Sequence, residues 1–190
     1  MIATTICRRD LFKKLFLELF TQSRNLPVEV LYEEDNKTIS VGAKRQKLLE
    51  RAKGEYIVFF DSDDWPMPYY VSEILEALER KPDCVGFLIH MTTNGQRPQV
   101  CCHSLQYPVW KGDGKTKIDG YDYVRNVTHF NCVRRDLALQ VGFKDLRFGE
   151  DKIYSDAVSK LCDTEVFINK KLFHYRYSNA VPHKKKYGIR

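Results

Sequence analysis

The sequence contains no long apolar run. A membrane-spanning helix needs about 20 consecutive apolar residues, and none of the 190 residues belongs to such a stretch. The segment from Met1 to Cys7 leads directly into Arg8 and Arg9, so it lacks the apolar centre of a secretory signal and suits a first strand. From these two absences we expect no transmembrane segment and a cytoplasmic protein.

Cysteine patterns that bind zinc are also missing. None of the six cysteines forms a Cys-x-x-Cys pair, and they are scattered along the chain as Cys7, Cys84, Cys101, Cys102, Cys132 and Cys162. This distribution favours reduced thiols over a disulfide framework or a zinc site, which agrees with a cytoplasmic location.

Internal repeats, low-complexity linkers and a strong charge imbalance are absent too. The net charge of +6 is moderate, so it fits an enzyme for phosphorylated substrates and also permits a polyanionic acceptor. A hydrophobic content of 43% in 190 residues is enough for one ordinary domain with a core. We expect a single domain over residues 1–180, followed by a basic tail over 181–190.

The chain does contain a regular alternation of strand and helix patterns. We expect strands over 2–6, 28–32, 56–60 and 85–89, separated by helices that begin at a capping Asp10 and over 41–53 and 69–81. Residues 92–120 suit a hairpin or loop insertion, and helices over 134–141 and 150–161 and strands over 166–168 and 172–177 follow. This alternation predicts a three-layer, Rossmann-like α/β fold with a mostly parallel central sheet.

Three carboxylates end the predicted strand 56–60, which is apolar on both faces. Open α/β sheets bind ligands beyond the carboxyl ends of their strands, so Asp61 and Asp63 are expected at the rim of a cleft. Their hard oxygen donors suit Mg²⁺ or Mn²⁺ carrying a phosphate ester. Asp64 has a structural alternative, since a side-chain oxygen ahead of Pro66 and Pro68 can cap a helix.

Three motifs together resemble family 2 glycosyltransferases of the GT-A fold. The run from Gly42 to Asp64 is similar to the nucleotide-sugar core of that family, Phe148-Gly149-Glu150-Asp151 to its Glu-Asp motif, and the segment 173–176 to its closing strand. The resemblance implies inverting, metal-dependent transfer of a sugar from a nucleotide-diphospho-sugar, expected to be UDP-linked, to an acceptor hydroxyl. The implied acceptor is a glycan precursor, and the implied cofactor is Mn²⁺ or Mg²⁺.

The same resemblance implies roles for individual residues at the metal and at the base. Asp63 is the expected direct metal ligand, with Asp61 nearer the ribose or a metal-bound water, and His174 is the expected third ligand. Asp151 matches the general base that takes the acceptor's proton. Both His174 and Asp151 have structural alternatives, as a satisfied histidine among aromatics and as an acid that complements a helix dipole.

Nucleotide binding is implied at four further positions. Thr5 and Asp35 match residues that hold the base, and Lys44 or Arg45 would approach the base or the phosphates, unless they form a solvated basic helix face. The chain departs from the family pattern at Cys7-Arg8, at Glu33-Glu34-Asp35 and at Gln46, which leaves the choice of base-binding acid open.

The acceptor side is less defined. Trp65, Trp110, His129, Arg134 and Arg135 could line it, because sugars stack on aromatic faces and phosphates pair with arginine, or they could serve packing. Two alternative functions remain open at this point: sugar transfer to a modified nucleic-acid base, which no nucleic-acid-binding motif supports, and a non-catalytic nucleotide-sugar-binding module.

Overall fold

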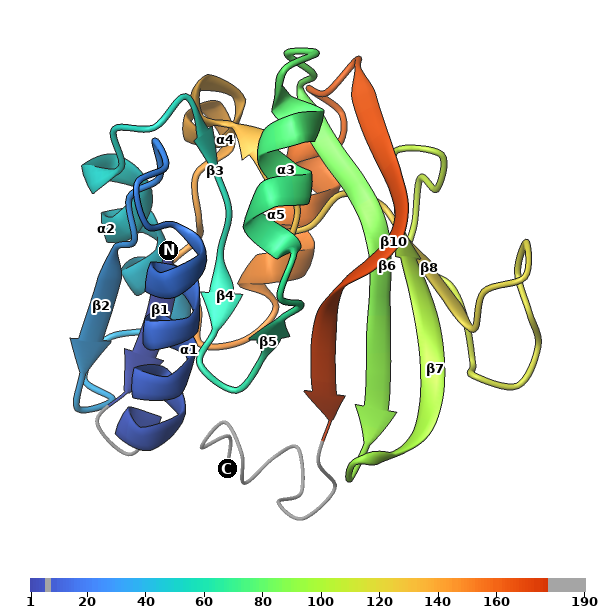
Figure 1. The fold of residues 1–190 in the computed structure, drawn as a ribbon, viewed down its shortest axis with the longest axis horizontal. Coiled ribbons are helices and arrows are strands. Elements are labelled where there is room, and N and C mark those ends of the chain that lie inside the picture. Colours follow the sequence, from blue (N-terminus) through green and yellow to red (C-terminus); the bar gives the residue numbers. More distant parts are fainter. Residues whose placement is uncertain (6–7, 178–190) are drawn as a thin grey trace.

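Two β-sheets run through the molecule, with helices on both faces (Figure 1). The computed structural model describes residues 1–5 and 8–177. The smaller sheet has the order β2 (Tyr32–Asp35), β1 (Ile2–Thr5), β4 (Phe60–Asp61). The larger sheet has the order β3 (Tyr56–Ile57), β9 (Cys132–Arg134), β6 (Cys84–Thr93), β10 (Glu165–Tyr177), β5 (Trp65–Pro66), and it also contains β7 (Gln96–His103) and β8 (Tyr123–Arg125).

The predicted three-layer α/β fold is confirmed. The helices are α1 (Arg9–Gln22), α2 (Val41–Arg51), α3 (Tyr70–Leu78), α4 (Arg135–Val141) and α5 (Glu150–Val158). Helices α1 and α3 pack into one hydrophobic core, and α2, α4 and α5 pack into a second. The sheets are mostly but not entirely parallel. The β1–β2, β1–β4 and β6–β10 pairs are parallel, whereas β6 runs antiparallel to β7 and β9.

The run Tyr56–Phe60 is apolar on both faces because it supplies both cores. Ile57 and Phe59 belong to the core under α2, α4 and α5, and Phe60 belongs to the core under α1 and α3. Alternation along an extended chain places successive side chains on opposite faces. The segment is therefore the partition between the two cores, as the sequence pattern predicts.

The prediction of one continuous strand here is wrong, because the segment leaves one sheet and enters the other. Tyr56 and Ile57 pair antiparallel with β9, whereas Phe60 and Asp61 pair parallel with β1. Between them, the Phe59 N–H donates to the His129 carbonyl at 2.9 Å. Hydrophobicity alone does not specify which neighbour supplies the backbone hydrogen bonds.

Several element boundaries also differ from the sequence-based expectation. β2 begins at Tyr32 instead of 28, because Tyr32–Asp35 pairs in register with Ile2–Thr5, so its acids lie within the strand. Helix α1 follows Arg8 without a side-chain cap, so Asp10 is in its first turn and is not its cap. Helix α3 likewise follows Tyr69, which excludes Asp64 as its cap. The two expected C-terminal strands form one strand, β10, interrupted by register shifts between Ile168 and Phe173.

Helix α2 covers most of the range 41–53 expected for it, and Leu48, Leu49 and Ala52 are buried. The structure adds a cap at Ser40, whose Oγ accepts the Ala43 N–H at 2.9 Å. The expected hairpin after residue 92 joins β6 to β7 through Asn94 and Gly95. Their φ values of 52° and 73° suit a two-residue hairpin turn.

The structure also describes the cysteines and the helices that bear on the sequence-based expectations. The described cysteines, which are Cys84, Cys101, Cys102, Cys132 and Cys162, are free and buried. Cys7 and the predicted tail 181–190 lie outside the described residues. Within the part of the chain that the structure describes, no helix has both the length and the apolar composition to cross a membrane.

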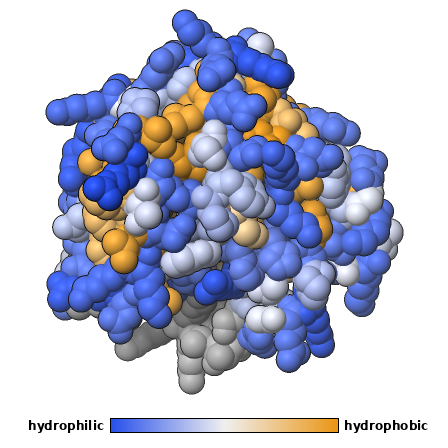
Figure 2. All heavy atoms as spheres, viewed as in Figure 1, coloured by the Kyte–Doolittle hydropathy of each residue, from blue (hydrophilic) through white to orange (hydrophobic). Residues whose placement is uncertain are grey.

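Replacing Phe59 or Phe60, which lie between the two cores, by alanine should destabilise the fold. Phe59→Ala and Phe60→Ala each remove a fully buried ring, so each should lower the free energy of unfolding by about 3–5 kcal/mol. The control is Phe20→Ala, because Phe20 is 57% exposed on α1, where apolar residues gather on the surface shown in Figure 2. It should cost less than about 1 kcal/mol. Urea denaturation measures the free energy of unfolding of the three variants. A similar decrease in all three would contradict the two-core arrangement.

Candidate active site

The carboxyl ends of three neighbouring parallel strands lie at one edge of the smaller sheet. Strands β1, β2 and β4 point the same way in Figure 1, so their carboxyl ends share that edge. Asp35 ends β2, Asp61 ends β4, and Asp63 lies two residues further on. Thr5 ends β1 in register with Asp35, but its side chain is outside the described part of the structure. This edge is where an α/β sheet is expected to bind a ligand.

Asp35 and Lys44 form a nearly buried ion pair at this edge. Lys44 Nζ is 2.6 Å from Asp35 Oδ1, and Asp35 Oδ2 accepts the Ile39 N–H at 3.0 Å. Burial works against the carboxylate charge, but the hydrogen bonds from Lys44 and Ile39 outweigh it and lower the pKa of Asp35 to about 2. The two residues, both candidates for nucleotide binding, therefore act as one ionised pair.

Arg45 joins the end of β4 to the start of α5. Its Nη2 donates to Asp61 Oδ1 at 2.6 Å, and its Nη1 donates to a carboxylate oxygen of Glu150. Nη2 also lies 3.0 Å from His129 Nε2. We call these four residues, Arg45, Asp61, His129 and Glu150, the Arg45 cluster.

The electrostatics of the Arg45 cluster keep the arginine charged and the histidine neutral. Burial opposes the charge of Arg45, which is 2% exposed, but Asp61, Glu150 and Asp151 together raise its pKa. Burial and the charge of Arg45 lower the pKa of His129 well below its usual range. Neutral His129 can thus accept a hydrogen bond from the guanidinium at Nε2. Burial raises the pKa of Glu150, and the adjacent Arg45 opposes that shift.

Asp151 lies beside this cluster, at the first turn of α5. It is half-buried, and its Oδ1 accepts the Lys152 N–H at 2.8 Å. Its charge is among those that raise the pKa of Arg45, so it is within electrostatic range of the same guanidinium as Asp61. The structure therefore brings Asp61 and Asp151, separated by 90 positions in the sequence, to one region.

Asp63 and Asp61 offer the oxygen donors that a divalent ion prefers. Arg8 Nη1 contacts Asp63 Oδ1 at 2.8 Å, in a pair that is about one-third exposed. Within residues 1–5 and 8–177, no three histidine, cysteine or acidic side chains are gathered as a ligand set. Mg²⁺ is commonly held by one or two carboxylates, with substrate phosphates and water completing its shell. Asp61 and Asp63 fit that mode once their arginine partners share them with a phosphate-bearing ligand.

His174 lies in a different setting from these acids. It pairs with Trp65 across β10 and β5, and its Nε2 is 2.9 Å from Thr92 Oγ1. Burial, His90 and Arg176 lower the pKa of His174 to about 4, so it is neutral near pH 7. The structure thus gives His174 a hydrogen-bond partner and does not gather it with Asp61 and Asp63 into a three-residue ligand set.

Glu150 is the site residue that sequence reasoning missed as an individual contributor. It shares one face of α5 with Tyr154 and Val158, at intervals of four residues, and all three are buried. Asp151 is on the adjacent, more exposed face. The helical period therefore contained the signal that separates the two acids of the motif, one facing inward and one accessible.

Besides His129, two more of the suggested acceptor residues have structural partners. Arg134 pairs with Asp83 and Asp136, at 2.7 Å each, away from the Arg45 cluster. Trp110 lies against α5, where its Nε1 donates to Asn126 Oδ1 at 2.7 Å and to Ser155 Oγ at 3.2 Å. Arg134 thus serves the fold, whereas Trp110 contacts Ser155, which lies one helical turn along α5 from Asp151.

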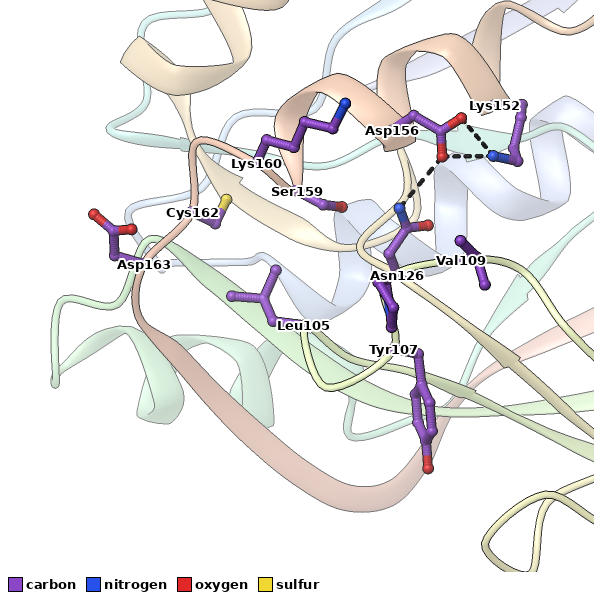
Figure 3. A pocket seen from close by; sticks show the side chains of 11 residues that line it. Leu105, Tyr107, Val109, Asn126, Lys152, Asp156, Ser159, Lys160, Cys162 and Asp163 are labelled. Carbon is purple, nitrogen blue, oxygen red and sulfur yellow. Dashed lines mark hydrogen bonds and ion pairs between the residues drawn. The ribbon is translucent and has the colours of Figure 1, made fainter.

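A hollow of about 580 Å³ opens along α5 (Figure 3). Lys152, Asp156 and Ser159 line it from the helix, and Leu105 and Val109 line it from the opposite loop. Asp61, Asp63 and Asp151 are not among its lining residues. The hollow therefore runs along α5 from Lys152 towards the C-terminal end of the helix and is separate from the Arg45 cluster.

Comparison with known proteins finds a family match over most of the chain. The profile of glycosyl transferase family 2 matches residues 8–141. EpsH of Bacillus subtilis (strain 168), which is named as a glycosyltransferase, is 39% identical over 57 residues, or 30% of this chain and 16% of EpsH.

Solved structures of S. aureus TarS share the fold. Residues 1–349 of TarS in complex with UDP-GlcNAc align with a TM-score of 0.62 and 15% identity, covering 92% of this chain and 57% of that one. The same fragment in complex with UDP aligns with a TM-score of 0.63 and 16% identity, covering 99% and 62%. The chain thus spans less than two thirds of the length of these relatives.

Removing the guanidinium should destabilise the protein because it leaves Glu150 buried without a cation. Arg45→Met should lower the free energy of unfolding by about 3–5 kcal/mol, and adding Glu150→Gln should recover a large part of that loss. Arg51→Met on the same helix is the control. Arg51 pairs with Glu33 at the surface, so its loss should cost at most about 1 kcal/mol. If adding Glu150→Gln to Arg45→Met lowers the free energy of unfolding further, the Arg45–Glu150 ion pair does not stabilise the cluster in this way.

Proposed function

The chain belongs to glycosyl transferase family 2, and from this premise we propose that it transfers a sugar from a nucleotide-diphospho-sugar to an acceptor hydroxyl. The observation that carries the proposal is the Arg45 bridge between Asp61 and Glu150. Arg45 connects two parts of the site. The acids at the strand ends would bind the donor, and Asp151, which lies near Arg45, would act on the acceptor. Both halves of a transfer reaction are needed there, whereas a binding module needs only the first.

The donor half of the proposal rests on the ends of β2 and β4. The ionised Asp35–Lys44 pair is at the position where the nucleoside would lie, and Thr5 is next to it in register. TarS is described in complex with UDP-GlcNAc and with UDP, which supports a UDP-linked donor for this chain. Arg45 fixes Asp61 in one orientation, so Asp61 meets the donor pre-organised.

Asp63, with Asp61 beside it, would hold Mn²⁺ or Mg²⁺, and the bound ion would supply positive charge opposite the departing diphosphate. Arg8 donates a hydrogen bond to Asp63. When Asp63 also binds the metal ion, the Arg8 guanidinium can turn toward a phosphate of the donor. His174 as a further ligand stays a proposal. Its Nε2 is held by Thr92 Oγ1, which leaves Nδ1 as the nitrogen that could face a metal ion.

Asp151 is the proposed general base. The Lys152 N–H holds its Oδ1, which leaves Oδ2 to take the proton of the attacking hydroxyl. A single displacement at the anomeric carbon needs one base and no carboxylate nucleophile on the other face. The proposed reaction therefore inverts the anomeric configuration, and a glycan precursor is the proposed acceptor.

Changing the base should stop transfer and spare donor binding. Asp151→Asn keeps the size of the side chain but cannot accept the proton, so turnover should fall by about 100- to 10,000-fold. The affinity for UDP, measured by calorimetry, should change less than about threefold. Asp136→Asn, an exposed acid on α4, is the control. Undiminished turnover in Asp151→Asn would exclude this residue as the base, and tight UDP binding without any turnover in the wild type would favour a binding module.

Metal dependence is tested by donor-induced thermal stabilisation. A ligand that binds only the folded state raises the melting temperature by mass action. UDP-GlcNAc with Mn²⁺ should stabilise the wild type more than UDP-GlcNAc with EDTA, and Asp63→Asn should abolish that difference. Asp113→Asn, in an exposed turn, should leave it intact. The same stabilisation with EDTA as with Mn²⁺ would refute metal-assisted donor binding.

A further inference from the structure

Trp110 is fixed in place against α5, where its partner Ser155 lies one helical turn from Asp151. Its indole N–H is shared between Asn126 Oδ1 and Ser155 Oγ, whose residues are 2% and 0% exposed. Ser155 Oγ is itself anchored, since it donates to the Val127 carbonyl at 2.7 Å. Ser155 follows Asp151 by four positions, so the two lie on the same side of α5. The orientation of the Trp110 ring is therefore set by buried partners and does not depend on a substrate.

Arg125 is stacked on this ring. Its guanidinium carbon is 4.3 Å from the ring centroid, a cation–π geometry that orients the guanidinium without neutralising it. Arg125 is half-buried, and within residues 1–5 and 8–177 no carboxylate forms an ion pair with it. Arginines in partly buried positions usually have an anionic partner, because removing a charge from water is costly.

The electrostatic neighbourhood of Arg125 reaches the Arg45 cluster. Burial, followed by the charge of Arg125, lowers the pKa of His103 to about 3. Arg125 also contributes to lowering the pKa of His129, after burial, Arg45 and His103. Both histidines are consequently neutral near pH 7, and because histidine is never negatively charged, neither can balance the positive charge of Arg125. A guanidinium in that state presents parallel N–H donors that match an oxyanion.

A second cation and an open space complete this region. Lys152 Nζ is 5.5 Å from the Trp110 ring centroid and pairs with Asp156. Lys152 and Asn126 both line the hollow along α5, where Figure 3 shows them joined through Asp156. Asp156 and Ser159 offer partners for hydroxyl groups, and Leu105 and Val109 offer apolar surface. This combination suits a saccharide, which has both polar and apolar faces.

We propose that Arg125, oriented by Trp110, binds an oxyanion carried by the acceptor saccharide, either a phosphate or a carboxylate group, close to Asp151. The remainder of the acceptor occupies the hollow along α5. This rests on the proposed transferase function and extends it, because it assigns the acceptor to the anionic saccharides. Trp110 acts as a positioning residue, and Arg125 makes the contact.

The test uses three sugars that differ only at C6, the carbon outside the ring: glucose, glucose 6-phosphate and glucuronic acid. Binding to the full chain saturated with UDP is followed through the indole N–H signal of Trp110 in ¹H–¹⁵N spectra. The chain has two tryptophans, so Trp65→Phe assigns the signal. The two anionic sugars should shift it and bind at least tenfold more tightly than glucose. A response to only one of them identifies the oxyanion as phosphate or as carboxylate.

Variants separate a charge contact from a structural role. Arg125→Gln should remove the preference for anionic sugars, and Arg125→Lys, which keeps the charge, should retain part of it. Arg80→Gln removes an exposed arginine after α3 and should leave the preference intact. The spread of the spectrum shows whether each variant is folded.

Equal affinity for all three sugars, or an unchanged preference in folded Arg125→Gln, overturns the proposal. Failure here is distinguishable from failure of the transferase proposal. UDP binding without any response of Trp110 overturns only the oxyanion site. A response of Trp110 in a chain that does not bind UDP supports the oxyanion site and counts against the transferase proposal.

Discussion

One buried guanidinium holds the two halves of the candidate active site together. Arg45 donates hydrogen bonds to Asp61 at the end of β4 and to Glu150 at the start of α5. Arg45 and Glu150 are nearly buried, so leaving either of them unpaired would cost several kcal/mol. The nearly buried charges of Arg45 and Glu150 therefore depend on each other, and the partly exposed Asp61 adds a second partner for Arg45. Since α2 supplies Arg45, the packing of Leu48 and Leu49 in the same helix determines where the bridge is anchored. The position of α5, and hence of Asp151, depends on this contact.

Charge balance extends the same principle along the edge of the sheet. Asp35 is paired with Lys44, Asp63 with Arg8, and Glu34 with Arg9, so the acids at the strand ends are largely compensated by the chain itself. A diphosphate and its divalent ion bring charges of both signs, and they can enter by sharing these pairs without leaving a buried charge unpaired. Arg125 differs from these residues, because its guanidinium stacks on the neutral ring of Trp110 and, over residues 1–5 and 8–177, forms no ion pair.

Much of the fold was predictable from the sequence, and the reasons for the errors are physical. The alternation of strands and helices and the buried Leu48–Leu49 pair follow from local periodicity. The division of Tyr56–Phe60 between two sheets does not, because the same apolar run satisfies either pairing and only the neighbouring strands decide it. Asp61 and Asp151 could be proposed from motifs, whereas the Arg45–Glu150 contact spans 105 positions and has no local signature beyond the inward face of α5. The surroundings of His174 were equally inaccessible, since they depend on the register between β10 and β5.

Asp61 and Glu150 are both bound to Arg45, although only Asp61 is proposed to lie at the donor. A double-mutant cycle on the affinity for the nucleotide-sugar, with Asp61→Asn, Glu150→Gln and their combination, measures whether the two acids act together. We expect Glu150→Gln to weaken donor binding, and we expect the two effects to be non-additive by about 1 kcal/mol or more. Effects that add to within about 0.5 kcal/mol would contradict it, because independent residues behave in that way.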